Sequence, residues 1–244
     1  MPRPARRSFS EGRSGPLFVP PWRDFEWQAT QKFMHNYFQQ YIKAVTKPLP
    51  EMAEFFVKEN NYLKNLITAN SVVLDVGCGN GRTMKFLAPL VKEIVGLDYD
   101  PKMIEAARQN LLGLGNAGLK QEDFFKIDLG QKFDLVYASY NLLGSAELAQ
   151  ERRNELLQKM VSDTKIGGHT VFSVWSDKGI DFAKKYYPYI GIKFLEIRDN
   201  DVVTDQGIFK RFSKQELESL AKPFGKHFKV LELTGIFYLL DIEN

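Results

Sequence analysis

Residues 72–82 read VVLDVGCGNGR, and this short stretch decides the fold. It begins with an apolar, β-branched run that carries one acidic residue, Asp75, and it continues with three glycines in alternation. This pattern predicts a buried strand that turns sharply into a helix over residues 82–90. Glycine admits positive φ and leaves the backbone bare, and the first N–H groups of the helix point toward the loop. We therefore predict that this loop binds a polar small molecule. The glycines are Gly77, Gly79 and Gly81.

The glycine spacing argues against two other nucleotide-binding loops. The dinucleotide fingerprint is Gly-x-Gly-x-x-Gly, but here the third glycine comes one residue early and Arg82 stands in its usual place. No Gly-Lys-Ser/Thr follows, so the phosphate loop of the nucleotide triphosphatases is absent as well. The stretch resembles motif I of the class I S-adenosylmethionine (SAM)-dependent methyltransferases. A glycine-rich turn is also an ordinary strand-to-helix connection, so the interpretation depends on the segments that follow.

The next predicted strand, residues 93–97, ends at an acidic residue, Asp98. A carboxylate at the tip of the second strand can accept hydrogen bonds from both hydroxyls of a ribose. A helix then follows, with Pro101 in its first turn and apolar residues on one face. The alternative is a solvated carboxylate at a strand end. We assign Asp98 to the ribose of the cofactor and its neighbour Tyr99 to the same site.

Residues 121–125 read QEDFF and come after the next glycine-rich turn. In the family, an acidic residue at the end of the third strand accepts from the adenine amine, and the N–H of its neighbour meets the ring. The resemblance places Asp123 and Phe124 in these positions. The alternative is a surface carboxylate beside a core phenylalanine. The resemblance also implies cofactor contacts from the first loop, by Asp75, Gly77, Cys78 and Gly79. Cys78 is the only cysteine of the chain, and we read it as a small residue that fits a tight turn, not as a nucleophile.

A fourth strand is predicted over residues 132–138, and Tyr140 and Asn141 emerge at its carboxyl end. Ligands of open α/β sheets lie outside the carboxyl ends of the strands. Residues 139–144 are therefore expected to face the sulfonium, with Tyr140 in contact with the cofactor and Tyr140 and Asn141 positioning the acceptor. A helix over residues 156–166, a turn at 167–168 and a strand over 169–176 complete the resemblance.

The predicted fold is α/β. The resemblance implies a three-layer, Rossmann-like methyltransferase fold, with a seven-stranded, mostly parallel sheet whose last strand is antiparallel. We expect a disordered segment over residues 1–21 and a single methyltransferase domain over residues 22–244. Within it, residues 24–66 form helices (24–46 and 51–66) and residues 177–212 form an insert after the fifth strand, on the substrate side.

Two of these segments are expected to shape the acceptor pocket. The helix over residues 24–46 carries an apolar stripe, which packs on the sheet or closes as a lid over the cofactor. Tyr37 and Tyr41, together with Trp27, offer aromatic faces to a sulfonium or a cationic substrate. Trp175 and Tyr186, near the start of the insert, are the other pocket candidates. Tyrosines and tryptophans in such numbers are also common in cores and interfaces.

The composition is that of a soluble globular protein, with 44% hydrophobic and 26% charged residues. A single cysteine excludes a disulfide framework. No apolar run approaches 18 residues and the first residues lack a secretory signal, so we expect a cytoplasmic protein with no membrane partner. The net charge of +3 is mild for a nucleic-acid binder. Four N-terminal arginines leave a nucleic-acid arm as the less favoured alternative. They are Arg3, Arg6, Arg7 and Arg13.

These residues and the resemblance together predict an enzyme that moves a methyl group from SAM to an N, O or C atom of a small molecule, leaving S-adenosylhomocysteine. No cluster of side chains has the spacing of a metal site, so no metal is expected. The Asn/Asp-Pro-Pro-Tyr motif of base-amino methyltransferases is absent, since Tyr140 is followed by NLLG. The alternatives are a tRNA or protein methyltransferase and a non-catalytic SAM-binding scaffold. The sequence does not define the attacked atom or the oligomeric state.

Overall fold

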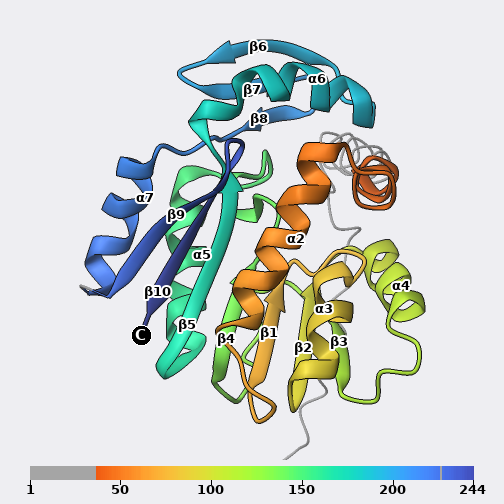
Figure 1. Cartoon of the computed structure of the whole chain (residues 1–244), viewed down its shortest axis with the longest axis vertical. Coiled ribbons are helices and arrows are strands. Elements are labelled where there is room, and N and C mark those ends of the chain that lie inside the picture. Colours follow the sequence, from red (N-terminus) through yellow and green to blue (C-terminus); the bar gives the residue numbers. More distant parts are fainter. Residues whose placement is uncertain (1–36, 226) are drawn as a thin grey trace, which may run out of the picture.

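The computed structural model describes residues 37–225 and 227–244. A seven-stranded sheet forms its centre, in the order β3-β2-β1-β4-β5-β10-β9 (Figure 1). The pairs from β3 to β5 are parallel, whereas β10 runs antiparallel to both of its neighbours, β5 and β9. The strands are β1 (Val72–Val76), β2 (Glu93–Asp98), β3 (Ala117–Gln121), β4 (Phe133–Ala138), β5 (Thr164–Trp175), β9 (Phe228–Thr234) and β10 (Phe237–Glu243). The predicted sheet, including its antiparallel last strand, is confirmed.

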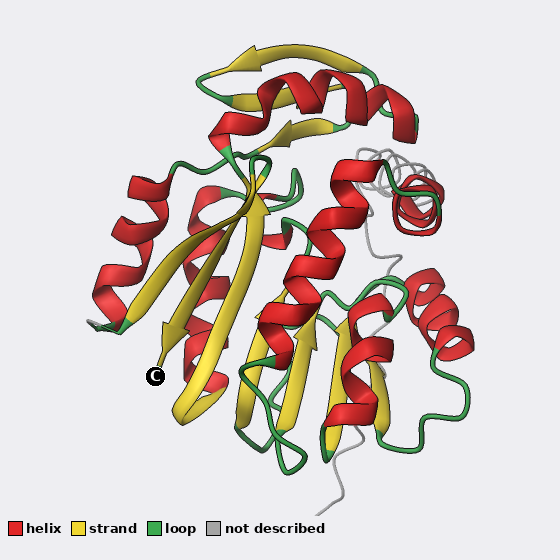
Figure 2. Cartoon of the chain, viewed as in Figure 1, coloured by secondary structure: helices red, strands yellow, loops and turns green. Residues whose placement is uncertain are grey.

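Helices cover both faces of this sheet and make three layers (Figure 2). On one face, α2, α3 and α4 bury apolar side chains against β1 and β2. On the other face, α5 and α7 do the same against β4, β5 and β10. These helices are α2 (Pro50–Lys64), α3 (Arg82–Leu87), α4 (Pro101–Asn110), α5 (Gln150–Asp163) and α7 (Lys214–Ala221). The central strands read as apolar runs because they are covered on both sides.

Local signals in the sequence explain where two of these helices begin. Asp100 caps α4, since its side chain accepts a hydrogen bond from the N–H of Lys102 at 2.8 Å. Ser213 and Glu216 form a reciprocal capping box at the start of α7.

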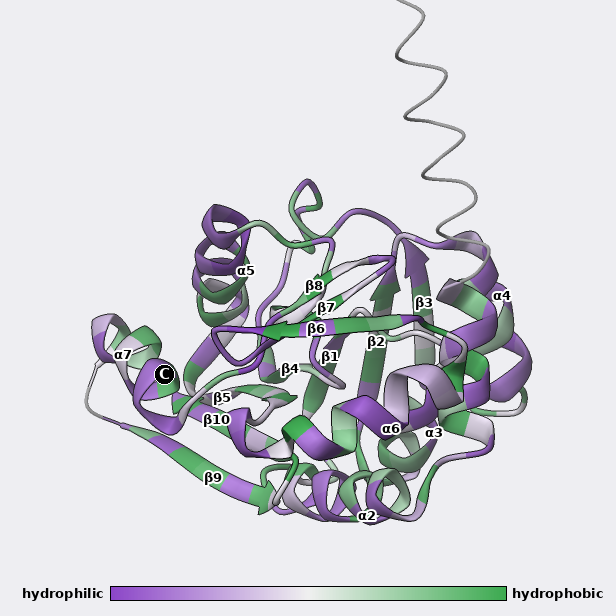
Figure 3. Ribbon diagram, turned by 90° about the horizontal axis from the view of Figure 1, so that it is seen from above, coloured by the Kyte–Doolittle hydropathy of each residue, from purple (hydrophilic) through white to green (hydrophobic). Residues whose placement is uncertain are grey.

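A smaller layer lies across the carboxyl ends of the parallel strands (Figures 1 and 3). It consists of α6 (Ile180–Ile190) and a three-stranded antiparallel sheet of β6 (Phe194–Arg198), β7 (Asp201–Thr204) and β8 (Gly207–Phe209). A tight turn joins β6 to β7, with Asp199 and Asn200 at φ values of 49° and 72°. We call this layer the cap. A separate cluster of buried apolar side chains packs the cap against α2 and the end of β5.

Two predicted boundaries need correction. The helix expected over residues 156–166 begins earlier, at Gln150, and ends at Asp163. The hydroxyl of Thr164 donates to the carbonyl of Met160 at 2.8 Å, and the chain turns there into β5. Ile166, where the predicted helix ends, lies in β5 and is 95% exposed. The predicted helix therefore ran past its true end.

The predicted helix over residues 24–46 is described only from residue 37, and residues 37–46 are helical. Its fully buried positions are Gln40 and Ala44, whereas the residues of the predicted apolar stripe that the structure describes are only partly buried. Trp27, the N-terminal arginines and the predicted disordered segment 1–21 lie outside the described residues.

Candidate active site

Two adjoining cavities open above the carboxyl ends of β1, β2 and β4. The larger has a volume of about 510 Å³ and is bounded by the glycine loop, the end of β2 and α5. The smaller has a volume of about 80 Å³ and reaches from the glycine loop to the cap. Their shared walls include Tyr37, Tyr41, Gly77 and Leu142. The helix over residues 37–46 therefore borders both spaces, as expected of a segment that closes over a ligand.

The glycine loop that follows β1 has the backbone conformation predicted for it. The φ values of Gly77, Gly79 and Gly81 are 70°, 53° and 72°, a region that side chains other than glycine rarely adopt. A Cβ atom on Gly79 would lie 2.3 Å from the hydroxyl oxygen of Tyr41. The N–H of Cys78, which is buried, donates to the carbonyl of Leu97 at 2.8 Å. The loop is thus anchored on β2 and presents bare backbone to the cavities.

Asp75 lies at the end of β1 beneath this loop and is 2% exposed. Its Oδ2 atom accepts a hydrogen bond from the hydroxyl of Tyr137 at 2.7 Å. Its Oδ1 atom is buried and has no hydrogen-bond partner among the described residues. Burial raises the pKa of this carboxyl to about 7. A ligand that brings a cationic N–H donor to the free oxygen would relieve the cost of this buried acceptor.

Asp98 stands at the tip of β2, as predicted, and lines the larger cavity. It holds the glycine loop in place, because Oδ2 accepts from the N–H of Gly79 at 2.9 Å. Oδ1 accepts from the N–H of Asp100 at 3.0 Å. Burial raises the pKa of Asp98 to about 6. Each carboxylate oxygen keeps further acceptor capacity toward the cavity.

Three other predicted cofactor residues line the same cavity. Tyr99, which is 48% exposed, donates from its hydroxyl to Glu147 at 2.5 Å across the mouth. Asp123 follows β3 and accepts from the N–H of Phe125 at 3.0 Å. Phe124 is 7% exposed and packs in the core beside the cavity. The structure therefore brings the residues after β1, β2 and β3 together around one space.

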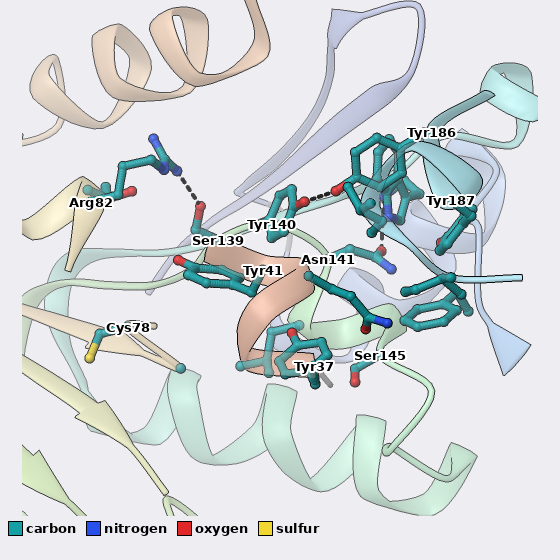
Figure 4. Close-up of a pocket in the computed structure, with 18 of the residues that line it drawn as sticks. Tyr37, Tyr41, Cys78, Arg82, Ser139, Tyr140, Asn141, Ser145, Tyr186 and Tyr187 are labelled. Atoms are coloured by element: carbon teal, nitrogen blue, oxygen red, sulfur yellow. Dashed lines mark hydrogen bonds between the residues drawn. The ribbon is translucent and has the colours of Figure 1, made fainter. Parts of the chain in front are cut away.

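The smaller cavity is walled mainly by aromatic rings (Figure 4). The ring of Tyr140 lies with its centroid 5.8 Å from that of Tyr41 and 6.4 Å from that of Trp175. Trp175 in turn lies 5.2 Å from Tyr186, whose hydroxyl contacts that of Tyr140. Burial raises the pKa of Tyr140 well above its ordinary value, so this hydroxyl stays protonated. All four predicted pocket residues, Tyr37, Tyr41, Trp175 and Tyr186, line this cavity.

The chain turns sharply after β4, where Tyr140 and Asn141 have φ values of 59° and 65°. Such values are unusual for residues other than glycine and mark local strain. The side chain of Asn141 holds the turn, since its Oδ1 accepts from the N–H of Trp175 at 3.0 Å. Its Nδ2 donates to the carbonyl of Lys210 at 3.4 Å. Its amide is therefore engaged by the backbone, while the ring of Tyr140 faces the cavity (Figure 4).

The sequence interpretation missed a buried glutamate on α2. Glu59 is 2% exposed, and its Oε1 accepts from the hydroxyls of Ser139 at 2.7 Å and Ser173 at 2.5 Å. Ser173 also accepts from the N–H of Tyr140 at 2.8 Å. Glu59 thereby supports the strained turn from behind. The available signal was a charged residue at helical spacing among the buried apolar residues of α2. These are Met52, Phe55, Phe56 and Leu63.

Glu59 also fixes Arg82, the residue that replaces glycine after the loop. Oε2 of Glu59 accepts from Nη2 of Arg82 at 2.7 Å, and the guanidinium lies 4.0 Å from the ring centroid of Phe56. A second bond joins Arg82 to Ser139 at 3.2 Å (Figure 4). Nη1 of Arg82 is buried without a hydrogen-bond partner among the described residues, and Arg82 lines the smaller cavity.

Groups elsewhere in the described part of the chain do not add to this site. No group of three or more His, Cys, Asp or Glu side chains there is placed to hold a metal ion. His169 pairs with the buried Asp241 at 2.9 Å, and His227 is exposed. Neither lines the two cavities. None of the described helices combines the length and apolarity needed to cross a bilayer.

Comparison with known proteins gives the same family as the motifs. The family model for a methyltransferase domain matches residues 67–186. A putative methyltransferase of Invertebrate iridescent virus 6 is 31% identical over 90 residues, which are 36% of this chain and 33% of that protein. A putative methyltransferase of Encephalitozoon cuniculi is 27% identical over 150 residues, or 59% and 63% of the two chains. The matched part thus spans less than two thirds of these relatives.

The solved structures that resemble this chain share its fold at low sequence identity. A structure described as the DhpI–SAM–HEP complex superposes with a TM-score of 0.63 at 19% identity, covering 86% of this chain and 95% of the other. Other relatives are named as methyltransferases of ribosomal RNA, of protein isoaspartate and of malonyl-[acyl-carrier protein]. These relatives share the reaction type in their names and differ in the acceptor, whereas a further relative is named as a carboxy-S-adenosyl-L-methionine synthase.

Proposed function

We propose that this chain, which belongs to the class I SAM-dependent methyltransferases, transfers a methyl group from SAM to a small-molecule acceptor bound in the smaller cavity. The observation that carries the proposal is the pair of adjoining cavities at the glycine loop. The larger suits a nucleoside, and the smaller is narrow, aromatic and covered by the cap. An enclosed space lined by apolar rings and a few polar groups is typical of small-molecule sites.

The residues of the larger cavity, together with Asp75 and Arg82 at the loop end of the smaller one, fit the cofactor of this family. The bare backbone at Gly79 lets Tyr41 lie directly against the loop at the edge of the cavity, where any Cβ would collide with it. The free Oδ1 of Asp75 is suited to the methionine ammonium, and Nη1 of Arg82 to its carboxylate. Asp98 is proposed to accept from the ribose hydroxyls, with Tyr99 beside it. Asp123 and Phe124 are proposed to meet the adenine.

Bound SAM supplies a methyl group already activated by a sulfonium, so the protein acts chiefly by positioning and by excluding water. Tyr41 and Tyr37 line both cavities next to the glycine loop. The ring of Tyr140 faces the smaller cavity. Asn141 and Glu59 hold Tyr140 in its strained turn from two sides. We therefore propose that Tyr140 positions the acceptor and that Asn141 acts through the backbone.

The small-molecule acceptor is preferred over tRNA or protein because of the charges on the cap. The cap lysines Lys184 and Lys185 pair with Asp181 and Glu51, and Arg198 pairs with Glu196. A surface built to bind phosphates would leave such cations unpaired. The scaffold alternative is disfavoured by the intact set of Asp75, Asp98 and the glycine loop. The single domain over residues 22–244, the insert role of residues 177–212 and the cytoplasmic location remain predictions.

Methyl transfer from radiolabelled SAM tests the proposal. The protein is incubated with either a small-metabolite extract or total tRNA and protein, and the products are separated by size. We expect label in the small-molecule fraction and its loss with Gly79→Val. Label confined to tRNA or protein would contradict the proposed acceptor. Absence of SAM binding in calorimetry would contradict all of the enzymatic interpretations together.

A further inference from the structure

The wall of the smaller cavity contains a polar group that no part of the proposed cofactor site uses. Gln40, in the helix over residues 37–46, is 8% exposed and lines this cavity. Its Nε2 donates to the carbonyl of Gly191 at 3.2 Å, which fixes the orientation of the amide. Its Oε1 is buried and has no hydrogen-bond partner among the described residues.

A buried acceptor without a donor costs about 1–3 kcal/mol unless a ligand supplies one. The surroundings of Gln40 are otherwise apolar or aromatic, with Ile190, Ile192, Tyr187 and Phe209 on the same cavity. An N–H or O–H group carried on a compact apolar body fits this environment. Gln40 is thus suited to orient an acceptor molecule by one hydrogen bond.

The charged residues of the smaller cavity limit the chemical class of the acceptor further. Of the described residues that line it, Asp75 and Arg82 are the only carboxylate and the only cation, and no histidine or lysine is among them. Arg82 is paired with Glu59, so an acidic acceptor finds no second cation at the Gln40 end. Asp75 lies at the loop end, where its Oδ2 is bound by Tyr137. Among the described residues, the Gln40 end therefore offers no counterion for a carboxylate and no base for an alcohol.

We propose, on the basis of the proposed methyltransferase function, that the acceptor is a compact primary or secondary amine whose N–H donates to Oε1 of Gln40. An amine that has lost its proton to water before binding needs no enzymatic base, because this neutral form carries the attacking lone pair. Its nitrogen forms the new bond to the methyl carbon, and the electron pair of the broken C–S bond stays on sulfur. The positive charge passes to the product nitrogen, and its extra proton leaves to water after release.

The aromatic walls suit the charge that develops on this nitrogen. The rings of Tyr140, Trp175 and Tyr186 lie within 6.4 Å of their neighbours and enclose the cavity near the cap. Aromatic faces stabilise ammonium groups by about 0.5–2 kcal/mol each, more when water is excluded. Buried tyrosine hydroxyls stay protonated here, since burial raises the pKa of Tyr140 and Tyr37. They can therefore accept or donate a hydrogen bond but do not supply a competing negative charge.

Calorimetric titration of the protein loaded with S-adenosylhomocysteine tests this proposal without relying on turnover. Benzylamine, benzyl alcohol and benzoate serve as probes of similar size, and benzyltrimethylammonium serves as a cation that carries no N–H at any pH. We expect benzylamine to bind at least about tenfold more tightly than the alcohol or benzoate. Equal binding of the three, tighter binding of benzoate or the alcohol, or no binding of benzylamine would overturn the proposal.

The variant Gln40→Met keeps the length of the side chain but removes its acceptor oxygen. We expect it to weaken benzylamine binding by about tenfold and benzyltrimethylammonium binding by less than about twofold, because only benzylamine has an N–H for Oε1. Gln39→Met, at an exposed position of the same helix, is the matched control and should change neither. Equal losses for both ligands would show a purely structural role for Gln40. Absence of S-adenosylhomocysteine binding to the unaltered protein would instead refute the cofactor site.

Discussion

The carboxylate of Glu59 and the guanidinium of Arg82 form a 2.7 Å ion pair that links α2 to the helix after the glycine loop. The same carboxylate bonds the hydroxyls of Ser139 and Ser173, and through Ser173 it reaches the N–H of Tyr140. One buried side chain thus holds both the loop side and the β4 side of the site.

Replacing Glu59 by alanine is expected to lower the free energy of unfolding by about 3–5 kcal/mol, because it leaves the Arg82 charge without its partner. Chemical denaturation measures the change. Glu54→Gln, on the exposed face of the same helix, should shift stability by less than about 0.5 kcal/mol. The more conservative Glu59→Gln keeps the shape and should recover part of the stability. Equal stability of Glu59→Ala and the unaltered protein would show that the hydrogen bonds and the ion pair of Glu59 do not stabilise the fold.

Asp98→Ala is expected to weaken binding of S-adenosylhomocysteine by about 1–3 kcal/mol, or roughly 5- to 150-fold. The substitution removes the acceptor proposed for the ribose and also the anchor of the Gly79 N–H. Calorimetry gives the dissociation constant, with Asp181→Ala as a control at an exposed position of α6. An unchanged constant for Asp98→Ala would remove Asp98 from the cofactor site.

Cofactor affinity should depend on pH through Asp75. Its raised pKa of about 7 means that the carboxyl is largely protonated below neutral pH in the free protein. A ligand with an ammonium group binds the ionised form, so its affinity should rise through pH 7 and level off above it. Methylthioadenosine, which lacks the amino-acid part, should not show this rise. The comparison isolates Asp75, since Asp98 faces the ribose of both ligands. Parallel pH profiles for the two ligands would contradict the assignment of Asp75.

Stability should depend on pH through His169, at the other end of the sheet. The hydrogen bond to Asp241 raises the pKa of His169 above its ordinary value. The contribution of this bond to the free energy of unfolding is therefore fully present below the unfolded pKa of about 6.5. It is lost as pH rises through the higher pKa of the folded protein. His169→Gln should flatten this part of the stability profile, and His227→Gln, at an exposed position, should leave it unchanged. If stability fell more steeply with rising pH in His169→Gln than in the unaltered protein, the predicted direction of the effect would be wrong.

The sequence was informative wherever a local pattern carries the structure. The apolar run before Gly77 and the acid at Asp98 each depend on neighbours along the chain, and each lies where it was predicted. Ile166 shows the limit of the method, because the sequence around it does not say where the helix stops.

The parts of the site that were missed depend on contacts between distant segments. Glu59 meets Ser173 across 114 positions of sequence, and Gln40 meets Gly191 across 151. Neither residue belongs to a motif, and a polar residue on a helix is most often solvated. Their burial follows from the packing of α2 and the cap, which no short pattern in the chain encodes.

The central claim is that the larger cavity binds the cofactor through the bare backbone of the glycine loop. Calorimetric titration of S-adenosylhomocysteine into the unaltered protein and into Gly79→Val, with folding checked by circular dichroism, tests it most directly. We predict one binding site in the unaltered protein and none in the folded variant, because the added side chain meets Tyr41 and the backbone is held at positive φ. Equal binding by both proteins would contradict the account.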